Sequence, residues 1–322
     1  MSMPQAPSGR RKGQAQALRK LPQIFGKAPS DSGGFFLNYV RVFHRTPQGG
    51  CPRIEDTVFS GNPLLASAIR ENVRIVGRRA LIPLLPRWPV LFRGLRTFGR
   101  VTSFCRNSFA MLGSVGVYPE VWSTPCGRSA RGGDLTFSFP CWSRALATIQ
   151  ERSGDWLYAA EFLDAFGNMI HKVCLTPDSD SEAFRWWVEL NHATSPTAEL
   201  SPYARFAPSV DDSDAHYEDD ASVLSENDFR ALLRRSIEAE TSVQILVANE
   251  GLAQGARMVP NCLRDDGDWI YLGDHDCGLQ LRTGRPSQLS FRWSSSSREW
   301  VLKAYESEGR LVCTLCGRDD EE

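Results

Sequence analysis

The sequence predicts an α+β fold made by tandem duplication of one unit, in which a large antiparallel β-sheet is flanked by helices. Its 322 residues are more than one ordinary hydrophobic core usually organises, so two domains or two similar halves are expected. Apolar and polar residues alternate in Trp156–Leu163 and Met169–Leu175, and again in Trp300–Tyr305 and Leu311–Leu315, as in paired strands. The recurrence of this pattern predicts that the unit occurs twice.

Single residues also recur at an offset of 142 residues. The pairs are Asn107 and Asn249, Gly113 and Gly255, Asp134 and Asp276, Gly167 and Gly309, and Cys174 and Cys316. The number of identities decides nothing by itself, because average composition alone would give roughly four. The placement of the glycines carries more weight, since glycine is typical of turns between strands. We therefore expect all four glycines to lie in turns.

Helices are predicted beside the strands from capping signals and apolar spacing. Asn62 followed by Pro63 is typical of a helix start, and Pro89 is expected to begin a second helix. The segment DSDSEAFRWWVELNH offers several Asp or Ser caps, and Ser225 with Asp228 resembles a capping box. The buried stripes expected in the last three helices are Leu91, Leu95 and Phe98, then Phe184, Trp187 and Val188, then Phe229, Leu232, Leu233 and Ile237.

Composition divides the chain into four parts. Residues 1–34 carry six basic residues against one acid and are expected to form a disordered basic tail. Residues 35–194 form the predicted N-terminal repeat with a helical lead-in, and residues 225–322 the C-terminal repeat. Residues 195–224 combine prolines with a run of acids, which is typical of a linker.

Charge and hydropathy exclude several classes of protein. A formal net charge of −1 leaves no surplus of cations for phosphates, so nucleic-acid binding is not expected. The longest apolar stretch, Ala80–Phe92, holds three prolines and an arginine and is too short to cross a bilayer. The basic N-terminus lacks the apolar run of a secretory signal, so a cytoplasmic location is expected. The nine cysteines are then expected to be reduced and mostly buried.

The common catalytic and metal-binding motifs are absent from the sequence. It contains no Gly-rich phosphate loop, GxSxG elbow or HExxH helix, so no catalytic residue is assigned. Cys313 and Cys316 could bind zinc with Cys262 and Cys277, but sulfurs three residues apart in a strand point to opposite faces, which favours buried thiols. The identity of any metal stays open. Five scattered histidines are interpreted as surface or hydrogen-bonded residues: His44, His171, His192, His216 and His275.

Three segments carry a family resemblance: FGRVTSFCRNSFAM, DLTFSFPCW and AFGNMIHKVCLTPDSDSEAF. Together they resemble the bacterial haemin-degrading factor family, cytoplasmic haem-utilisation proteins also described as haemin transport proteins. The similarity runs from Trp88 to Glu189 and, more faintly, from Ser225 to Arg318. Each chain of that family is a tandem duplication of a sheet-rich unit with flanking helices, which agrees with the repeat inferred above.

The resemblance implies haem as the cofactor, held in a cleft of the C-terminal half by an axial histidine and by basic residues at the propionates. The position of that histidine is Asn227 here, and asparagine is a poor iron ligand. A family arginine falls on Thr136 and a family tyrosine on Cys316, while a family lysine aligns with Arg292. These four positions are the implied cofactor-binding residues. Each also has an ordinary interpretation, as a helix start, a strand residue, a buried thiol or a solvated hairpin residue.

Two functions from different classes follow from this comparison. The first is a haem-binding protein of haem and iron utilisation, in which carriage is favoured over oxygenase-like haem degradation because the axial ligand is missing. The second is a haem-free duplicated scaffold that binds another apolar anionic ligand or a protein partner. The partners expected for the first are haem, or a similar small apolar anion, and a protein that donates or accepts haem. Neither a membrane span nor nucleic acid is expected.

Overall fold

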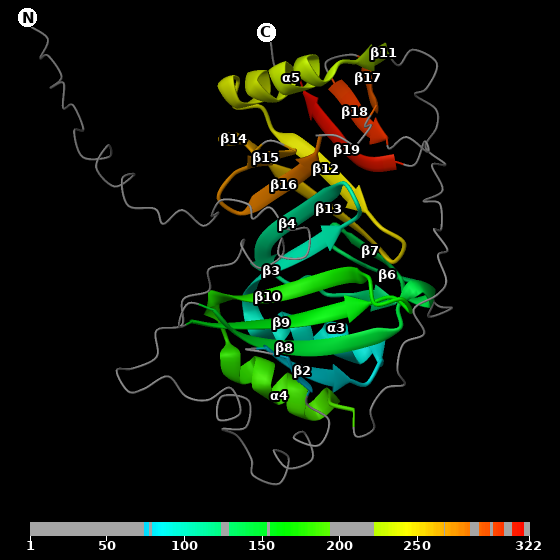
Figure 1. Cartoon of the computed structure of the whole chain (residues 1–322), viewed down its shortest axis with the longest axis vertical. Helices are drawn as coiled ribbons and strands as arrows, with labels where there is room; N and C mark the ends of the chain where they lie inside the picture. Colours follow the sequence, from blue (N-terminus) through cyan, green and yellow to red (C-terminus); the bar gives the residue numbers. More distant parts are fainter. Residues whose placement is uncertain are drawn as a thin grey trace, which may run out of the picture. The chain divides into compact units, whose positions relative to one another are not determined.

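Two antiparallel β-sheets dominate the structure, a computed structural model that describes residues 74–76, 79–123, 129–152, 155–193, 222–266, 268–283, 290–296, 299–305 and 311–318 (Figure 1). All of these residues lie in the unit that runs from Val42 to Glu322. The predicted tail 1–34, the helix expected at Asn62 and most of the predicted linker lie outside the described residues.

Sheet one, the 10-stranded sheet, joins strands from both ends of the described chain. In order across the sheet these are β1 (Arg74–Val76), β2 (Arg79–Leu84), β8 (Arg144–Arg152), β9 (Asp155–Leu163), β10 (Met169–Ser179), β3 (Gly99–Arg106), β4 (Ala110–Val117), β16 (Cys277–Arg282), β15 (Trp269–Gly273) and β14 (Cys262–Asp266). All neighbours are antiparallel. The strands predicted at 156–163 and 169–175 are therefore confirmed as β9 and β10.

Sheet two, the 9-stranded sheet, is built in the same way. Its order is β11 (Ser222–Leu224), β17 (Ser290–Ser296), β18 (Glu299–Tyr305), β19 (Leu311–Arg318), β12 (Val243–Ala248), β13 (Leu252–Met258), β7 (Leu135–Ser138), β6 (Ser129–Gly132) and β5 (Trp122–Ser123). The short strand β11 falls within the residues that the sequence assigns to the linker, 195–224, and it pairs with β17. Three residues are too few to show an alternating pattern, so only the cap at Ser225 marks this boundary in the sequence.

Each sheet takes a three-stranded meander from the other half of the chain. β4 pairs with β16, which brings β15 and β14 into sheet one, and β13 pairs with β7, which brings β6 and β5 into sheet two. From β2 and β11 onward the two sheets have the same strand order when positions are shifted by 142 residues. The predicted α+β class with antiparallel sheets is confirmed. The sheets do not coincide with the sequence segments 35–194 and 225–322.

The first described helix, α3 (Trp88–Leu95), begins as its proline predicts. Pro89 occupies the first turn, where its missing N–H costs no helical hydrogen bond. The helix buries Leu91, Phe92 and Leu95, and the 3-10 turn η3 (Arg96–Phe98) that follows buries Phe98. The predicted apolar stripe of this helix is therefore confirmed.

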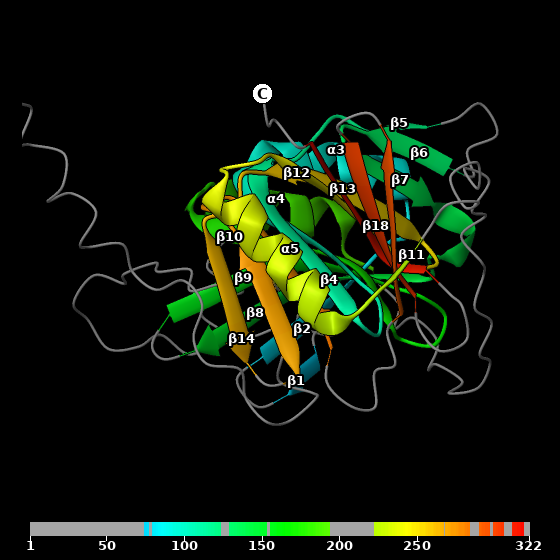
Figure 2. The same cartoon turned by 90° about the horizontal axis from the view of Figure 1, so that it is seen from above.

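The caps predicted for the two later helices are also present. The Asp180 side chain accepts hydrogen bonds from two backbone amides at the start of α4 (Ser181–Asn191), which buries Phe184, Trp187 and Val188. Ser225 caps α5 (Glu226–Glu238), with its hydroxyl accepting from the Asp228 amide. In Figure 2 α5 runs from β11, at the edge of sheet two, to β14, at the edge of sheet one. No described helix is long and apolar enough to cross a membrane.

Two of the four glycines predicted to lie in turns are in strands instead. Gly113 is in β4 and Gly255 is in β13. A Cβ at Gly113 would lie 2.8 Å from the Phe104 ring of the neighbouring strand β3, so this position has no room for a side chain. Gly167 does lie in a turn, with a positive φ of 84° that favours glycine. Gly309 lies outside the described residues.

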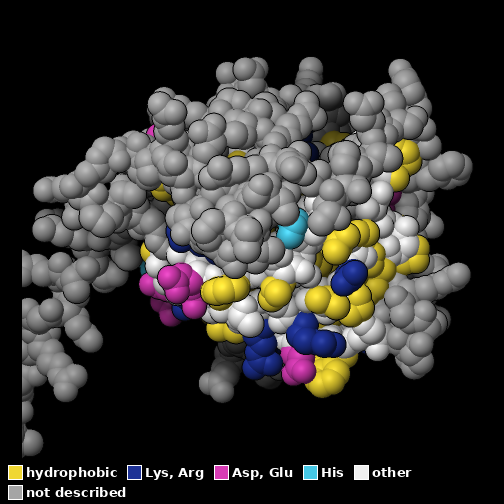
Figure 3. All heavy atoms as spheres, turned by 90° about the horizontal axis from the view of Figure 1, so that it is seen from below, with side chains coloured by type: hydrophobic (Ala, Val, Ile, Leu, Met, Phe, Trp, Pro, Cys, Tyr) yellow, Lys and Arg dark blue, Asp and Glu magenta, His cyan; other side chains and the backbone are white. Residues whose placement is uncertain are grey.

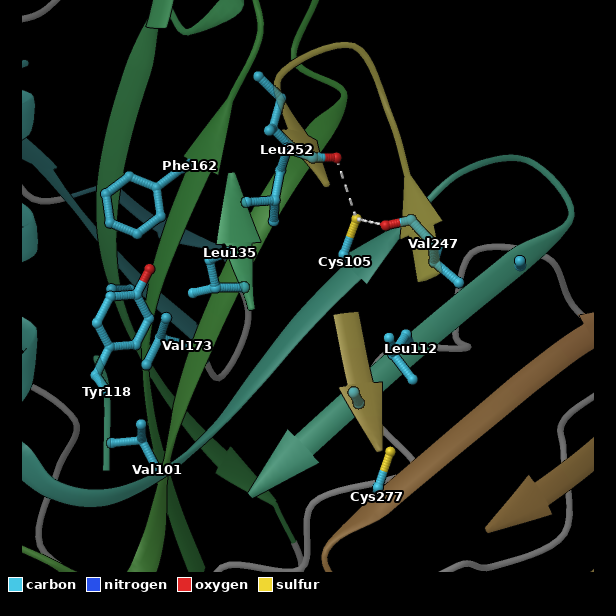
Figure 4. Close-up of a cluster of buried hydrophobic side chains, with 14 of the residues drawn as sticks. Val101, Cys105, Leu112, Tyr118, Leu135, Phe162, Val173, Val247, Leu252 and Cys277 are labelled. Carbon is cyan, nitrogen blue, oxygen red and sulfur yellow. Dashed lines mark hydrogen bonds between the residues drawn. The ribbon is translucent and has the colours of Figure 1, made fainter. Parts of the chain in front are cut away.

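The core fills the space between the two sheets, where β3 and β4 pack against β12 and β13. Figure 4 shows Cys105 of β3 pointing across this space at two backbone carbonyls of sheet two. Its thiol donates to the oxygens of Val247, at 3.4 Å, and Leu252, at 3.6 Å. Burial raises the pKa of this thiol well above its usual range, so Cys105 packs as a neutral donor.

Two asparagines join the halves of the chain by reciprocal hydrogen bonds. The Asn107 amide donates to the carbonyls of Ala248 and Val312, at 2.9 and 2.7 Å, in the C-terminal half. The Asn249 amide donates to the carbonyls of Arg106 and Ile170, at 3.0 and 2.7 Å, in the N-terminal half. Both sets of acceptors are related by the offset of 142 residues, as are the two asparagines. Specific polar contacts therefore join the two halves beside the apolar core.

His171 lies at the centre of an aromatic cluster inside the N-terminal part of the core. It is fully buried, with Nε2 2.9 Å from the Tyr118 hydroxyl and Nδ1 2.9 Å from the Phe104 carbonyl. The aromatic rings within about 6 Å of it belong to Tyr118, Phe137, Trp142 and Phe162. Of the two expected alternatives, a surface residue or a hydrogen-bonded one, His171 is the hydrogen-bonded one.

Burial lowers the pKa of His171 to about 4, and this predicts an acid-sensitive core. The unfolded imidazole titrates near 6.5, so the unfolded state binds the extra proton between these values. Stability is then complete above pH 6.5 and falls as the pH is lowered toward 4, by about 3 kcal/mol in all. Chemical denaturation as a function of pH should show a shallower decline for His171→Gln, which cannot titrate. Equal slopes for both proteins would contradict the assignment.

Candidate functional site

The side of sheet two that faces away from the core is exposed, and we call it the open face. In β12, Val243, Ile245 and Val247 are buried, whereas Gln244 and Leu246 between them are exposed. Cross-strand partners share this orientation along the sheet. Strand by strand, the described members of the open face are Val301 and Lys303, Thr314 and Cys316, Gln244, Leu246 and Ala248, Ala253, Gly255 and Arg257, Thr136, Arg131, and Trp122.

Three of the four residues implied by the family resemblance lie in this one sheet. Cys316 in β19 pairs with Gln244, and Thr136 in β7 pairs with Ala253, so both are on the open face. Arg292 in β17 occupies the register position opposite Lys303, although its side chain is outside the described part of the structure. Thr136 reaches this sheet only because β7 has crossed into it from the N-terminal half.

Asn227, the fourth implied residue, lies in the first turn of α5, beside the edge of sheet two. It follows β11 by three residues, and within β11 Val223 pairs with Arg292. Asn227 is exposed, so its side chain is open to a ligand at this edge. Its neighbour Asp228 is engaged instead in the cap, with its carboxylate 2.6 Å from the Ser225 hydroxyl.

The centre of the open face is small or apolar, and its rim is basic. Gly255, Ala253 and Ala248 leave a low floor beside Leu246, which is 42% exposed. The rim carries Arg257, Arg131 and Lys303, together with the acid Asp134, whose Cβ would lie 3.3 Å from a Cβ added at Gly255. A floor of this kind suits the flat apolar body of a ligand, and cations at its rim suit acidic groups on that ligand.

The described histidines do not lie on the open face. His171 is inside the core, His192 follows α4 with Nδ1 2.8 Å from the Glu189 carbonyl, and His275 is in the turn between β15 and β16 of sheet one. His44 and His216 lie outside the described residues. Of the described residues of the open face, Cys316 is the one whose side chain belongs to a type that commonly binds haem iron. The face thus fits the ring and the acid groups of haem better than its iron.

Cys313 and Cys316 lie on opposite faces of sheet two, as predicted. Cys313 is buried, and burial raises the pKa of its thiol to about 12, whereas Cys316 is half-buried on the open face. Among the described residues, no group of three or more His, Cys, Asp or Glu side chains could hold a metal ion. Of these two thiols, which the sequence analysis expects to be buried, Cys313 is buried and Cys316 is only half-buried.

The corresponding face of sheet one is occupied by its own side chains. The Lys172 ammonium lies 2.8 Å from the buried Glu161 carboxylate, which Arg79 also contacts. The Tyr271 ring covers Gly273 and Gly278, where an added Cβ would lie 2.2 and 2.8 Å from its atoms. Sheet one therefore lacks the low floor of the open face.

A second exposed apolar region lies on the helices that flank sheet one. Trp186 and Leu190 are 59% and 77% exposed one turn apart on α4, and Val90 on α3 is 48% exposed. Figure 3 shows hydrophobic side chains beside basic ones on the side of the molecule that carries α4. None of the sequence-predicted site residues lies on these helices, so we place the candidate site on the open face.

Sequence reasoning missed the basic residues Arg131 and Arg257. Neither stands in a motif, and both are exposed arginines of ordinary strands. Only the register shows that Arg131 is opposite Thr136 and that Arg257 is opposite Gln244 on the same face.

The fold is that of bacterial haem-binding and haem-degrading proteins of known structure. Holo-PhuS, a heme-binding protein from Pseudomonas aeruginosa, superposes with a TM-score of 0.65 at 19% identity, over 84% of this chain and 88% of that chain. The heme degrading enzyme ChuS of Escherichia coli O157:H7 superposes with a TM-score of 0.62 at 15% identity, over 80% of this chain and 86% of that chain. No curated protein sequence matches the chain.

Part of the sequence also matches a protein-family model. Residues 69–190 match the model of the haemin-degrading HemS.ChuX domain. The resemblance to the haemin-degrading family inferred from the sequence segments is therefore confirmed, and it covers most of the N-terminal half.

Proposed function

We propose that this protein binds haem on the open face of sheet two and serves haem and iron utilisation in the cytoplasm. The observation that carries the proposal is the meeting of Thr136, Cys316 and the Arg292 position in one sheet, although they are distant in sequence. The fold shared with heme-binding PhuS and heme-degrading ChuS supports the same ligand. Haem would supply an apolar ring for the floor and two carboxylates for the basic rim.

Carriage is the form of haem handling that the residues favour. An exposed asparagine lies in the first turn of α5 where the resemblance implies the axial histidine, and the described open face holds no histidine. Cys316 is the remaining candidate on that face for a bond to iron. A ligand held mainly by its ring and carboxylates can be passed on to a partner, and we infer that a haem-donating or haem-accepting protein is that partner.

We also infer that the two halves, 35–194 and 225–322, arose by duplication of one unit. The identical strand order of the two sheets and the reciprocal bonds of Asn107 and Asn249 support this origin. In this proposal the basic segment 1–34 is a tail and residues 195–221 link the halves.

Titration with haemin tests the proposed function. One equivalent of haemin is expected to saturate a shifted Soret band, with lower affinity than a histidine-ligated relative shows. Arg292→Ala is expected to weaken binding about tenfold by removing a charge-assisted contact, while Arg93→Ala, an exposed arginine on α3, is expected to change nothing. A band that never saturates would instead favour the haem-free scaffold. Rapid formation of a biliverdin-like product with ascorbate and oxygen would contradict carriage.

A further inference from the structure

Arg131 is placed on the open face by strands that the N-terminal half contributes. In the ladder β5–β6–β7, Arg131 of β6 pairs with Trp122 on one side and with Thr136 on the other. Directly opposed side chains in such a ladder have Cβ atoms about 5 Å apart. The three residues therefore form one row, and the row continues across β13 to Ala253 and across β12 to Ala248.

The Trp122 end of this row suits the edge of a flat ligand. Trp122 is 66% exposed, so its large apolar surface is open to contact at the edge of the sheet. Arg131 and Thr136 are exposed beside it, and Asp134, in the turn between β6 and β7, is the nearest acid in the sequence. Within the described part of the chain, Arg131 forms no ion pair with Asp134 or with any other acid.

The matching position in sheet one carries no cation. By the offset of 142 residues, Arg131 corresponds to Gly273, which lies under the Tyr271 ring. An arginine at this point is thus specific to the open face. It is not required by the shared architecture of the two sheets, because the same ladder forms around a glycine in sheet one.

We propose that Arg131 binds a carboxylate of the ligand on the open face, with the ligand ring lying over Ala253 and Ala248. This inference rests on the proposed function and names a residue that determines its specificity for an acidic tetrapyrrole. The planar guanidinium can hold both carboxylate oxygens at once. Arg131 pairs with Thr136, which has no charge of its own, so the guanidinium supplies the positive charge in this part of the open face.

The contribution of this contact to affinity is set by its exposure. A hydrogen bond to a charged group contributes about 1.5 to 3 kcal/mol when it is shielded, and less in open solvent. The ligand itself would cover Arg131 on binding. A loss of about tenfold in affinity is therefore expected when the guanidinium is removed.

Two ligands and three variants test the role of Arg131. Haemin affinity is expected to fall about tenfold in Arg131→Ala and by less in Arg131→Lys, which keeps the charge but not the planar fork. Haemin dimethyl ester, which has no free carboxylate, is expected to bind Arg131→Ala and the unaltered protein equally. Arg93→Ala is the matched control and should bind both ligands normally. Near-ultraviolet circular dichroism of each variant checks that the sheet is intact.

The outcomes separate this inference from the proposed function. If Arg131→Ala binds haemin as the unaltered protein does, or loses affinity equally for haemin and its ester, Arg131 does not bind a carboxylate and haem binding still stands. If the unaltered protein shows no saturable haemin band, the proposed function fails and the role of Arg131 fails with it.

Discussion

Replacing Asn107 or Asn249 by alanine is expected to destabilise the protein by about 4 kcal/mol, since each side chain makes four hydrogen bonds to backbone groups at about 1 kcal/mol each. Besides its two bonds to the other half, Asn107 accepts from the amides of Phe109 and Ala110, at 3.0 and 2.8 Å. Asn249 accepts in the same way from Gly251 and Leu252, at 3.0 and 2.9 Å. Urea denaturation measures the loss.

Two further variants separate the stability contributed by the hydrogen bonds within the turn from that contributed by the hydrogen bonds between the halves. Asn107→Asp keeps the oxygen that accepts from the turn amides but sets a carboxylate against the carbonyls of Ala248 and Val312. It should therefore be nearly as unstable as Asn107→Ala. Asn261→Ala removes an exposed asparagine and should change stability by less than about 0.5 kcal/mol. A stable Asn107→Asp would show that the bonds between the halves contribute little.

Asn227→His is expected to raise haemin affinity at least tenfold, about 1.4 kcal/mol, and to sharpen the Soret band. An imidazole at the start of α5 would supply the iron ligand that the described open face lacks. The backbone there is held by the Ser225 cap and by the pairing of β11 with β17, so the new side chain would be presented from a rigid element. Absorption titration of the purified variant measures both changes.

The matched control is Arg235→His on the same helix. Arg235 is exposed, eight residues further along α5, and about 12 Å from position 227 along the helix axis. A histidine at position 228 would be a poor control, because Asp228 takes part in the cap. Equal gains at positions 227 and 235 would mean that the imidazole binds haemin non-specifically. That result would rule out the hypothesis that the open face lacks only an iron ligand for tight haemin binding.

Local elements of the fold were predictable from the sequence, because their causes are local. The caps at Asp180 and Ser225 and the proline at position 89 all act within one helical turn, and each helix begins where they indicate. The alternating segments around Gly167 likewise predict a hairpin, and β9 and β10 form it.

The exchange of meanders between sheets was not predictable, because it depends on pairing between distant residues. Nothing in the residues of β7 shows that its partner is β13, more than a hundred positions away. The place of Gly113 in β4 was not predictable for the same reason, since the Phe104 ring that requires a glycine there belongs to another strand. A glycine seen in isolation is therefore taken for a turn.

The candidate site was predictable only in part for the same reason. The family resemblance pointed to positions 136, 227, 292 and 316 one at a time. The grouping of positions 136, 292 and 316 on one sheet depends on register, and so does the identification of Arg131. The sequence also gave no sign that the core would enclose His171, whose two partners lie 53 and 67 residues away.

The exchanged meanders also determine when the protein can finish folding during its synthesis. β4 ends at Val117, but β16, which pairs with it, begins only at Cys277. In the same way, β7 is synthesised long before β13, with which it pairs. At usual rates of translation β4 keeps an unpaired edge for roughly ten to thirty seconds. Such edges are where a growing chain can pair with a wrong strand or with another chain. We therefore expect the two halves to become stable together, once the strands of the C-terminal half have been synthesised, and not one after the other.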